Sequence, residues 1–182
     1  MMFSLSEIFQ LIIVTIVVGY IFSGVYSQFI KKSSKRFDWE DFTFSIYVAA
    51  PGIILHELMH KFVGMGLGIN AFFEAWPTGL VIGVVLKLIG SSFILLAPGY
   101  VVLPGLAPGL EMFLTALAGP ATNALLWGLG AYMIKNAKNQ SRKVALFWAM
   151  TAKLNMWLFI FNMIPLPPLD GFKVLTGLIA MV

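Results

Sequence analysis

Long apolar stretches, separated by short polar segments or by segments rich in glycine and proline, make up most of the chain. A helix needs about 20 apolar residues to cross a lipid bilayer. The stretches that reach this length lie at about residues 8–30, 42–66, 109–134 and 144–164. The last apolar piece, residues 172–182, follows a proline-rich break and is too short to cross alone. The pattern predicts an α-helical integral membrane protein with about four transmembrane helices.

Residues 67–108 do not fit this pattern, because several glycines and the Trp76-Pro77 pair divide them into short pieces. The pieces are rich in Val, Ile and Phe, and each has the length of a β-strand. They cover residues 69–76, 80–89 and 93–102. Strands at membrane depth must pair with one another or be buried in protein. The alternative is a transmembrane helix over residues 80–96 that carries Lys87.

The first apolar stretch is predicted to remain as a transmembrane helix. The residues before it lack the basic region of a signal peptide and include Glu7. The stretch is also too long for the core of a signal peptide, and it shows no small-residue cleavage site. We therefore divide the chain into an N-terminal helix with a polar linker, residues 1–41, and a membrane-embedded core, residues 42–182.

Composition agrees with a multi-pass protein of the cell membrane. Hydrophobic residues make up 59% of the chain and charged residues 11%, whereas soluble domains carry about 25% charged residues. The net charge of +4 comes from two basic clusters, residues 31–36 and 135–143. Such clusters beside apolar spans usually face lipid headgroups, so we expect contact with the bilayer and no binding of nucleic acid. The absence of cysteine excludes disulfides and thiolate metal ligands.

The second apolar stretch contains the sequence His56-Glu57-Leu58-Met59-His60, with the only two histidines of the chain. Residues i and i+4 lie on one face of a helix, so both imidazoles can reach a single metal ion. A glutamate directly after the first histidine can act on a metal-bound water without being a ligand. The alternative, a structural pair of histidines, is costly inside a bilayer. The motif therefore predicts hydrolytic metal chemistry.

A catalytic zinc ion would need one more protein ligand besides two histidines and a water. Of the three aspartates, Asp38 and Asp41 lie in the polar segment before the second span. Asp170 instead follows the proline-rich break amid apolar sequence, where an unpaired carboxylate is expensive. Direct metal ligation would explain its presence. Because Asp-Gly is also an ordinary turn dipeptide, a turn role for Asp170 stays open.

Two asparagines within the apolar spans are further candidates. Asn123 lies in the third span, where hydrogen bonding to helix backbone or to another amide is the competing structural role. Asn162 lies eight residues before Asp170, so it could face the site and donate to a developing oxyanion. Asn155 is assigned to packing.

Three motifs together resemble the site-2 protease family of intramembrane zinc metalloproteases. They are His56-Glu57-x-x-His60, Gly119-Pro120-x-x-Asn123, and the segment from Asn162 through Pro165 and Pro168 to Asp170-Gly171. The resemblance covers about residues 42–175. It implies one zinc ion per chain, held by His56, His60 and Asp170, with Glu57 as general base and Asn162 near the scissile carbonyl. One departure is Phe172, where the family often has a second glycine.

The resemblance also bears on substrate binding. Residues 93–102 are similar to the family's membrane re-entrant β-hairpin, which would place a hairpin-like segment between the second and third helices. An exposed edge there would hold an unwound substrate by strand addition. We therefore expect Ala97, Gly99 and Tyr100, together with Asn123, to be the substrate-binding residues.

The predicted function is that of a zinc metalloendopeptidase that hydrolyses peptide bonds within or near transmembrane segments of membrane proteins. Its expected partners are a substrate with a transmembrane helix and the lipid bilayer, and a homo-oligomer stays open. One alternative is an inactive pseudo-protease that binds membrane clients, against which the intact Glu57 argues. Another is a metal or ion transporter, but transporters typically show paired repeats, and this sequence has none.

Sidedness is the one point on which the sequence gives conflicting predictions. The positive-inside rule places both basic clusters in the cytosol, so the end of the second span with His60 would face outward. The resemblance implies the reverse, because members of the family generally open their site towards the cytosol.

Overall fold

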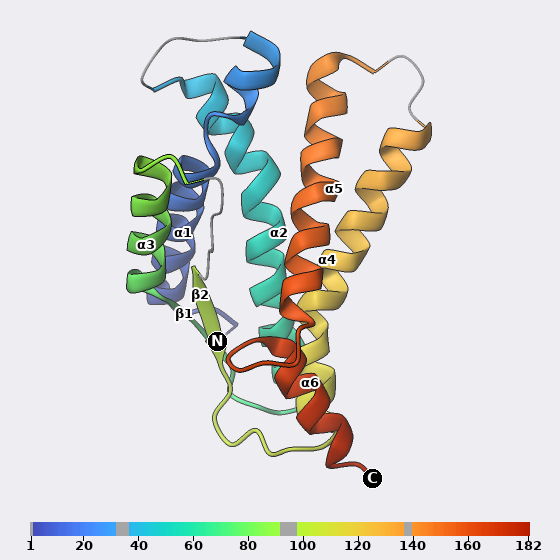
Figure 1. The fold of residues 1–182 in the computed structure, drawn as a ribbon. Coiled ribbons are helices and arrows are strands. Elements are labelled where there is room, and N and C mark those ends of the chain that lie inside the picture. The colour runs from blue at the N-terminus through green and yellow to red at the C-terminus, as the bar shows by residue number, and fades with distance from the viewer. Residues whose placement is uncertain (1, 32–36, 92–97, 137–139) are drawn as a thin grey trace.

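Four long helices form the body of the molecule in the computed structural model, which describes residues 2–31, 37–91, 98–136 and 140–182 (Figure 1). They are α1 (Leu5–Phe22), α2 (Trp39–Gly66), α4 (Leu110–Asn136) and α5 (Arg142–Asn162). A short π-helical turn, Ser27–Lys31, extends the first of them. All four are long and apolar enough to cross a membrane, which confirms the predicted spans.

Local sequence explains where several of these helices begin. Ser4 and Glu7 form a capping box at the start of α1, each side chain accepting a hydrogen bond from the backbone of the other. The Asp38 carboxylate accepts from the first backbone N–H groups of α2, and the Ser141 hydroxyl does the same for α5. These caps satisfy N–H groups that have no partner within the helix.

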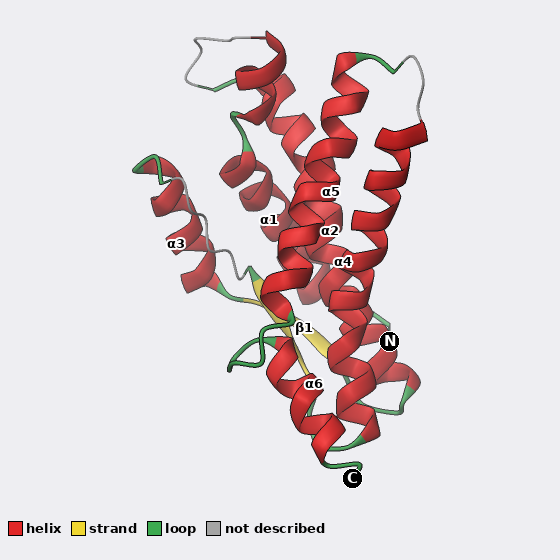
Figure 2. Cartoon of the chain, turned by 45° about the vertical axis from the view of Figure 1, so that its right-hand side comes forward, coloured by secondary structure: helices red, strands yellow, loops and turns green. Residues whose placement is uncertain are grey.

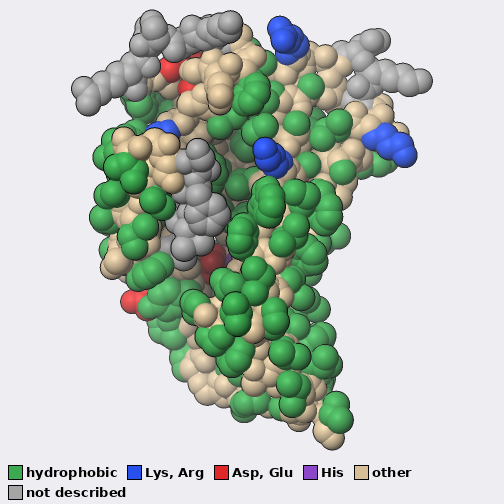
Figure 3. Space-filling view, in the orientation of Figure 1, with side chains coloured by type: hydrophobic (Ala, Val, Ile, Leu, Met, Phe, Trp, Pro, Cys, Tyr) green, Lys and Arg blue, Asp and Glu red, His purple; other side chains and the backbone are tan. Residues whose placement is uncertain are grey.

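Helix α2 is the central helix and packs against α1, α4 and α5. Val14 and Val18 of α1 meet Ala49 and Ile53 of α2 in the main buried cluster, to which Phe73 also belongs. The predicted boundary at residue 41 therefore divides two segments that share one core. Large apolar side chains cover much of the outer surface (Figure 3), as expected of helices that face lipid.

The segment between α2 and α4 contains a small sheet rather than a fifth span. Strands β1 (Phe72–Ala75) and β2 (Gly99–Val102) pair antiparallel, with Phe72 opposite Val102 and Ala75 opposite Gly99. This confirms strands within residues 69–76 and 93–102, and with them the predicted fold class. Both strands lie at the end of the bundle where α6 lies (Figures 1 and 2).

Residues 80–89 were wrongly predicted as a strand, because they belong to helix α3 (Pro77–Leu88). Proline is favoured at the first position of a helix, and here Pro77 occupies it. The alternative of a membrane-crossing helix over residues 80–96 is also wrong. Helix α3 has only 12 residues and is followed by Gly90 at φ +70°, a conformation that side chains disfavour.

The last helix, α6 (Asp170–Ile179), packs against α4. A Cβ added at Gly177 would lie 2.7 Å from the backbone nitrogen of Phe113, so glycine is needed for this close approach. Figure 1 shows the C-terminal ends of α1 and α4 and the N-terminal ends of α2 and α5 at one end of the bundle. Helix α6 lies at the opposite end.

Candidate active site

Helices α2 and α6 bring two histidines and one aspartate together inside the protein. His56 Nε2 and His60 Nε2 lie 3.1 Å apart, and each lies 3.1 Å from Asp170 Oδ2. All three residues are buried, and their potential ligand atoms fall within 4.8 Å of one another. Residues that are 110 positions apart in the sequence thus form a single cluster.

Gly171 explains how Asp170 reaches the histidines. A Cβ at Gly171 would lie 2.5 Å from the carbonyl oxygen of Met163 and 2.6 Å from that of Ile164, just after α5. Only glycine allows α6 to begin this close to the end of α5. The Asp-Gly pair therefore starts a helix that is packed tightly against its neighbour, and Asp170 is its first residue.

Hydrogen bonds on the outer side of each imidazole fix the position of its proton. His60 Nδ1 lies 2.7 Å from the carbonyl oxygen of Thr115, which can only accept, so Nδ1 carries the proton. His56 Nδ1 lies 2.6 Å from Asn123 Oδ1. Asn123 Nδ2 donates to the Gly52 carbonyl and to Asn155 Oδ1, which leaves Oδ1 as the acceptor for His56. In both rings the Nε2 atom is left with a free lone pair.

This arrangement suits a zinc ion. Two unprotonated Nε2 atoms and a carboxylate oxygen face one another without a hydrogen between them, and such a group is stabilised by a cation at its centre. Bonds of about 2.0–2.1 Å in tetrahedral geometry space the ligand atoms about 3.3 Å apart, close to the observed 3.1 Å. Three protein ligands leave the fourth position of a catalytic zinc site open.

Gly119 of α4 lies against both imidazole rings. A Cβ there would overlap His60 Nε2 and would lie 2.8 Å from His56 Cε1. The Gly119-Pro120-x-x-Asn123 motif thus has two functions in one helix. Its glycine allows α4 to approach the two histidines, and its asparagine, one turn later, orients His56.

Glu57 follows His56 on α2 and is half-buried. It interacts electrostatically with His56, Asp170 and Lys173, which places it beside the cluster without being part of it. Figure 3 shows an acidic side chain and part of a histidine at the bottom of a recess in the molecular surface, next to α5. A half-buried carboxylate beside the cluster can exchange a proton with a water molecule there.

The remaining predicted site residues lie in different surroundings. Asn162 Nδ2 donates to the Leu158 carbonyl within α5 at 2.9 Å, and among the described residues it has no hydrogen bond to the cluster. Asn123 is fully buried behind His56, and its Oδ1 lies 2.6 Å from His56 Nδ1. Gly99 and Tyr100 lie in β2, where Tyr100 is exposed. Ala97 lies outside the described residues.

Asn155 is the contact that sequence reasoning missed. It is fully buried, donates from Nδ2 to the Thr151 carbonyl and accepts from Asn123. An amide in an apolar span is the same observation that singled out Asn123. Applied to α5, it would have identified Asn155 as well.

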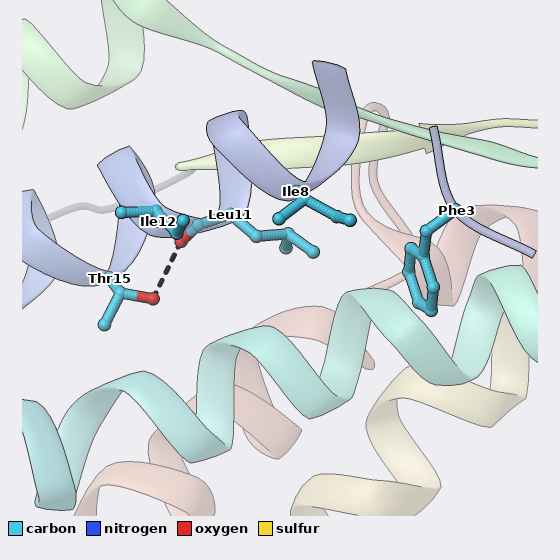
Figure 4. A pocket seen from close by; sticks show the side chains of 5 residues that line it. All are labelled: Phe3, Ile8, Leu11, Ile12 and Thr15. Atoms are coloured by element: carbon cyan, nitrogen blue, oxygen red, sulfur yellow. Dashed lines mark hydrogen bonds between the residues drawn. The ribbon is translucent and has the colours of Figure 1, made fainter. Parts of the chain in front are cut away.

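A second concave surface lies on α1, away from the histidines. Phe3, Ile8, Leu11, Ile12 and Thr15 line this apolar recess (Figure 4). Its single polar group, the Thr15 hydroxyl, donates to the Leu11 carbonyl in its own helix. Among the described residues that line it, the recess therefore has no side chain with an unsatisfied polar group.

Comparisons with known proteins agree with the site. Residues 79–182 match the model of peptidase family M50. The chain is 36% identical over 178 residues to "Putative zinc metalloprotease MJ0611" of Methanocaldococcus jannaschii, covering 95% of this chain and 85% of that protein. It is 34% identical over 80 residues to "Putative zinc metalloprotease YwhC" of Bacillus subtilis, covering 40% and 36% respectively. No solved structure matches the chain significantly.

Four apolar helices around a buried His-His-Asp cluster define a multi-pass membrane metalloprotease with zinc as its cofactor. The chain belongs to peptidase family M50, which confirms the predicted resemblance to site-2 proteases.

Proposed function

We propose that the protein is an intramembrane endopeptidase that cleaves peptide bonds within or near the transmembrane helices of membrane proteins. The observation that carries this proposal is the position of the cluster. Its two histidines lie in α2, a helix long and apolar enough to cross the membrane, and all three of its side chains are buried. Water and a scissile bond must therefore meet within the apolar body of the protein.

His56, His60 and Asp170 would hold the zinc ion. When bound, zinc supplies Lewis-acid activation of a water molecule and of the scissile carbonyl. Glu57 accepts a proton from the attacking water and then delivers it to the leaving nitrogen. In the balanced reaction a C–O bond forms, the C–N bond breaks, and the two products carry a carboxyl and an amino group.

The other polar residues orient these groups. The Thr115 carbonyl and Asn123 hold the two histidines with Nε2 facing the metal position. Asn162 uses one Nδ2 proton on the Leu158 carbonyl, and we propose that the other is donated to the oxyanion.

The sheet supports a mode of substrate binding. The amide bonds of a transmembrane helix are shielded by its own hydrogen bonds, so a substrate must unwind locally before cleavage. An unwound segment needs new backbone partners, which strand addition to a sheet supplies. We propose that it pairs with β2, in which the Tyr100 side chain is exposed.

The test compares the wild-type protein with Glu57→Gln, purified in detergent from the same membranes. The wild type should contain about one zinc ion per chain and cleave a single-span leucine–alanine peptide with a central Gly-Ser-Gly. Glu57→Gln should keep the metal and lose cleavage, because glutamine cannot accept the proton. Glu111→Gln, a change to an exposed carboxylate on α4, is the matched control. Undiminished cleavage by Glu57→Gln would refute the mechanism.

A further inference from the structure

Two side chains of α1 occupy the outer edge of β1. Glu7 Oε1 accepts a hydrogen bond from the backbone nitrogen of Phe73 at 2.7 Å, and Gln10 Oε1 accepts from that of Ala75 at 2.6 Å. Glu7 and Gln10 are one turn apart on the same face of α1. They thus satisfy the two successive N–H groups that β1 would otherwise offer to another strand.

Glu7 is also held from the other side by a buried lysine. Lys61 Nζ forms an ion pair with Glu7 Oε1, and the two residues are 2% and 6% exposed. Glu7 Oε2 meanwhile accepts from the Ser4 backbone. Lys61 directly follows His60 in α2, so this ion pair connects the edge of the sheet to the helix that carries the metal ligands. A buried ion pair is a poor source of stability, which favours a positioning role for this one.

The pairing register shows which edge of the sheet still has backbone groups available to pair with another strand. Because the N–H groups of Phe73 and Ala75 point to α1, the pairs that these residues form with Val101 and Gly99 are the non-hydrogen-bonded pairs of the sheet. The backbone groups of Gly99 and Val101 therefore point away from β1. Among the residues that the structure describes, none forms a hydrogen bond with them.

We propose that Glu7 and Gln10 are specificity-determining positioning residues that close the β1 edge, so that an extended substrate can pair only with β2. Lys61 neutralises Glu7 and fixes the closed edge relative to His60. This inference rests on the proposed function, because it concerns how the same peptide substrate is held. It gives α1 an indirect part in substrate binding, through β1.

The first experiment compares two double variants that have the same buried charge. They differ in whether the side chain at position 7 has an acceptor oxygen. The double variants Glu7→Gln/Lys61→Met and Glu7→Leu/Lys61→Met both remove the ion pair, and only the first retains an oxygen for the Phe73 N–H. Opening the edge lets the peptide bind where it cannot be cut. For Glu7→Leu/Lys61→Met we therefore expect kcat and KM for the leucine–alanine peptide to fall together by about fivefold to tenfold, with kcat/KM and zinc content within about twofold of wild type.

Glu7→Gln/Lys61→Met should restore the wild-type KM, since the amide oxygen of glutamine accepts the same hydrogen bond. A merely structural role would lower the folded fraction of both double variants, as measured by zinc bound per chain, and would leave KM unchanged. Equal KM values in the two double variants would overturn the proposal.

The second experiment uses the absence of native cysteine. Glu74 and Tyr100 are directly opposite each other, one on each strand. Glu74→Cys and Tyr100→Cys are made separately in the Glu57→Gln background, which binds the peptide without cutting it. A leucine–alanine peptide with one cysteine beside its central Gly-Ser-Gly is then oxidised with each variant.

The peptide should cross-link to Tyr100→Cys and at most weakly to Glu74→Cys. Adding Glu7→Leu/Lys61→Met and Gln10→Leu should raise the yield at Glu74→Cys severalfold. Equal yields at the two positions before these changes, or no increase after them, would overturn the inference. Neither result would touch the proposed function, which fails instead if the wild type does not cleave the peptide.

Discussion

The metal cluster and the β1–β2 sheet differ in how completely their polar groups are satisfied. In the cluster, each histidine has a fixed partner on its outer nitrogen, and Asn123 uses both of its Nδ2 protons. In the sheet, α1 satisfies one edge through side chains, while no described residue pairs with the other. In the function that we propose, the saturated region positions the catalytic groups, and the open edge accepts a backbone that is supplied by the substrate. Four predictions test this contrast.

The largest effect is expected from Asp170→Ala. Loss of a protein ligand should weaken zinc binding by more than about 100-fold, because even changes beyond the ligands weaken metal binding by about 10–100-fold. Peptide cleavage should disappear with the metal. Zinc content after dialysis measures the effect, with Asp38→Ala at the start of α2 as the control. A variant that retained one zinc ion per chain would leave Asp170 with only its role at the start of α6.

Gly119→Ala should come next. The added methyl group would overlap the His60 ring, so α4 must move away at a cost of about 1–3 kcal/mol in the free energy of unfolding. Zinc affinity should fall as well, because α4 carries the Thr115 carbonyl and Asn123, which hold the two histidines. Gly128→Ala is a matched control in the same helix, since a Cβ there would meet nothing within 4 Å. Equal thermal stability of the two variants would contradict this packing argument.

Asn123→Leu should have a smaller effect on the metal. The substitution keeps the approximate volume and removes the acceptor for His56 Nδ1, so zinc affinity should fall by about 10–100-fold. Asn155→Leu acts one hydrogen bond further away and should cost less than about tenfold. Competition with a zinc chelator gives both values, and Asn136→Leu on the exposed end of α4 serves as the control. If Asn155→Leu lowered zinc affinity more than Asn123→Leu, the proposed order of influence, with Asn123 next to His56 and Asn155 one hydrogen bond further away, would be wrong.

The smallest effect should be that of zinc removal on the sheet. Chelation should increase hydrogen exchange of amides near His56, His60 and Asp170, because the three ligands then repel one another. The amides of β1 should change little, since Glu7 and Gln10 hold them without help from the metal. Hydrogen exchange with and without chelator measures both regions at once. Loss of protection at Phe73 and Ala75 would show that the two regions are coupled.

The apolar stretches predicted the helical spans closely because length and composition alone decide whether a helix can cross a bilayer. The short pieces were harder to predict, because a run of ten apolar residues has the same periodicity in a strand as in a buried helix. Residues 80–89 were assigned to a strand for this reason. Pro77, at the first position of α3, was the local feature that favoured a helix.

Tertiary contacts explain what else the sequence left open. Asp170 had two interpretations because nothing local shows that Gly171 lets α6 begin against α5. Asn123 was expected to bind substrate, and its packing behind His56 depends on the approach of α4 to α2. The contacts of Glu7 and Gln10 are with strand residues 66 and 65 positions away, and no pattern in the sequence connects this strand to α1.

The distance along the chain between His60 and Asp170 has a consequence for biosynthesis. Membrane proteins are inserted as they are translated, and the 110 residues between these two ligands include α4 and α5. A nascent chain that has inserted α2 holds both histidines and Glu57, but it lacks the carboxylate that completes the cluster. The proposed catalytic centre therefore cannot form until α5 and the start of α6 are in place, so we expect a growing chain to be inactive during its own insertion.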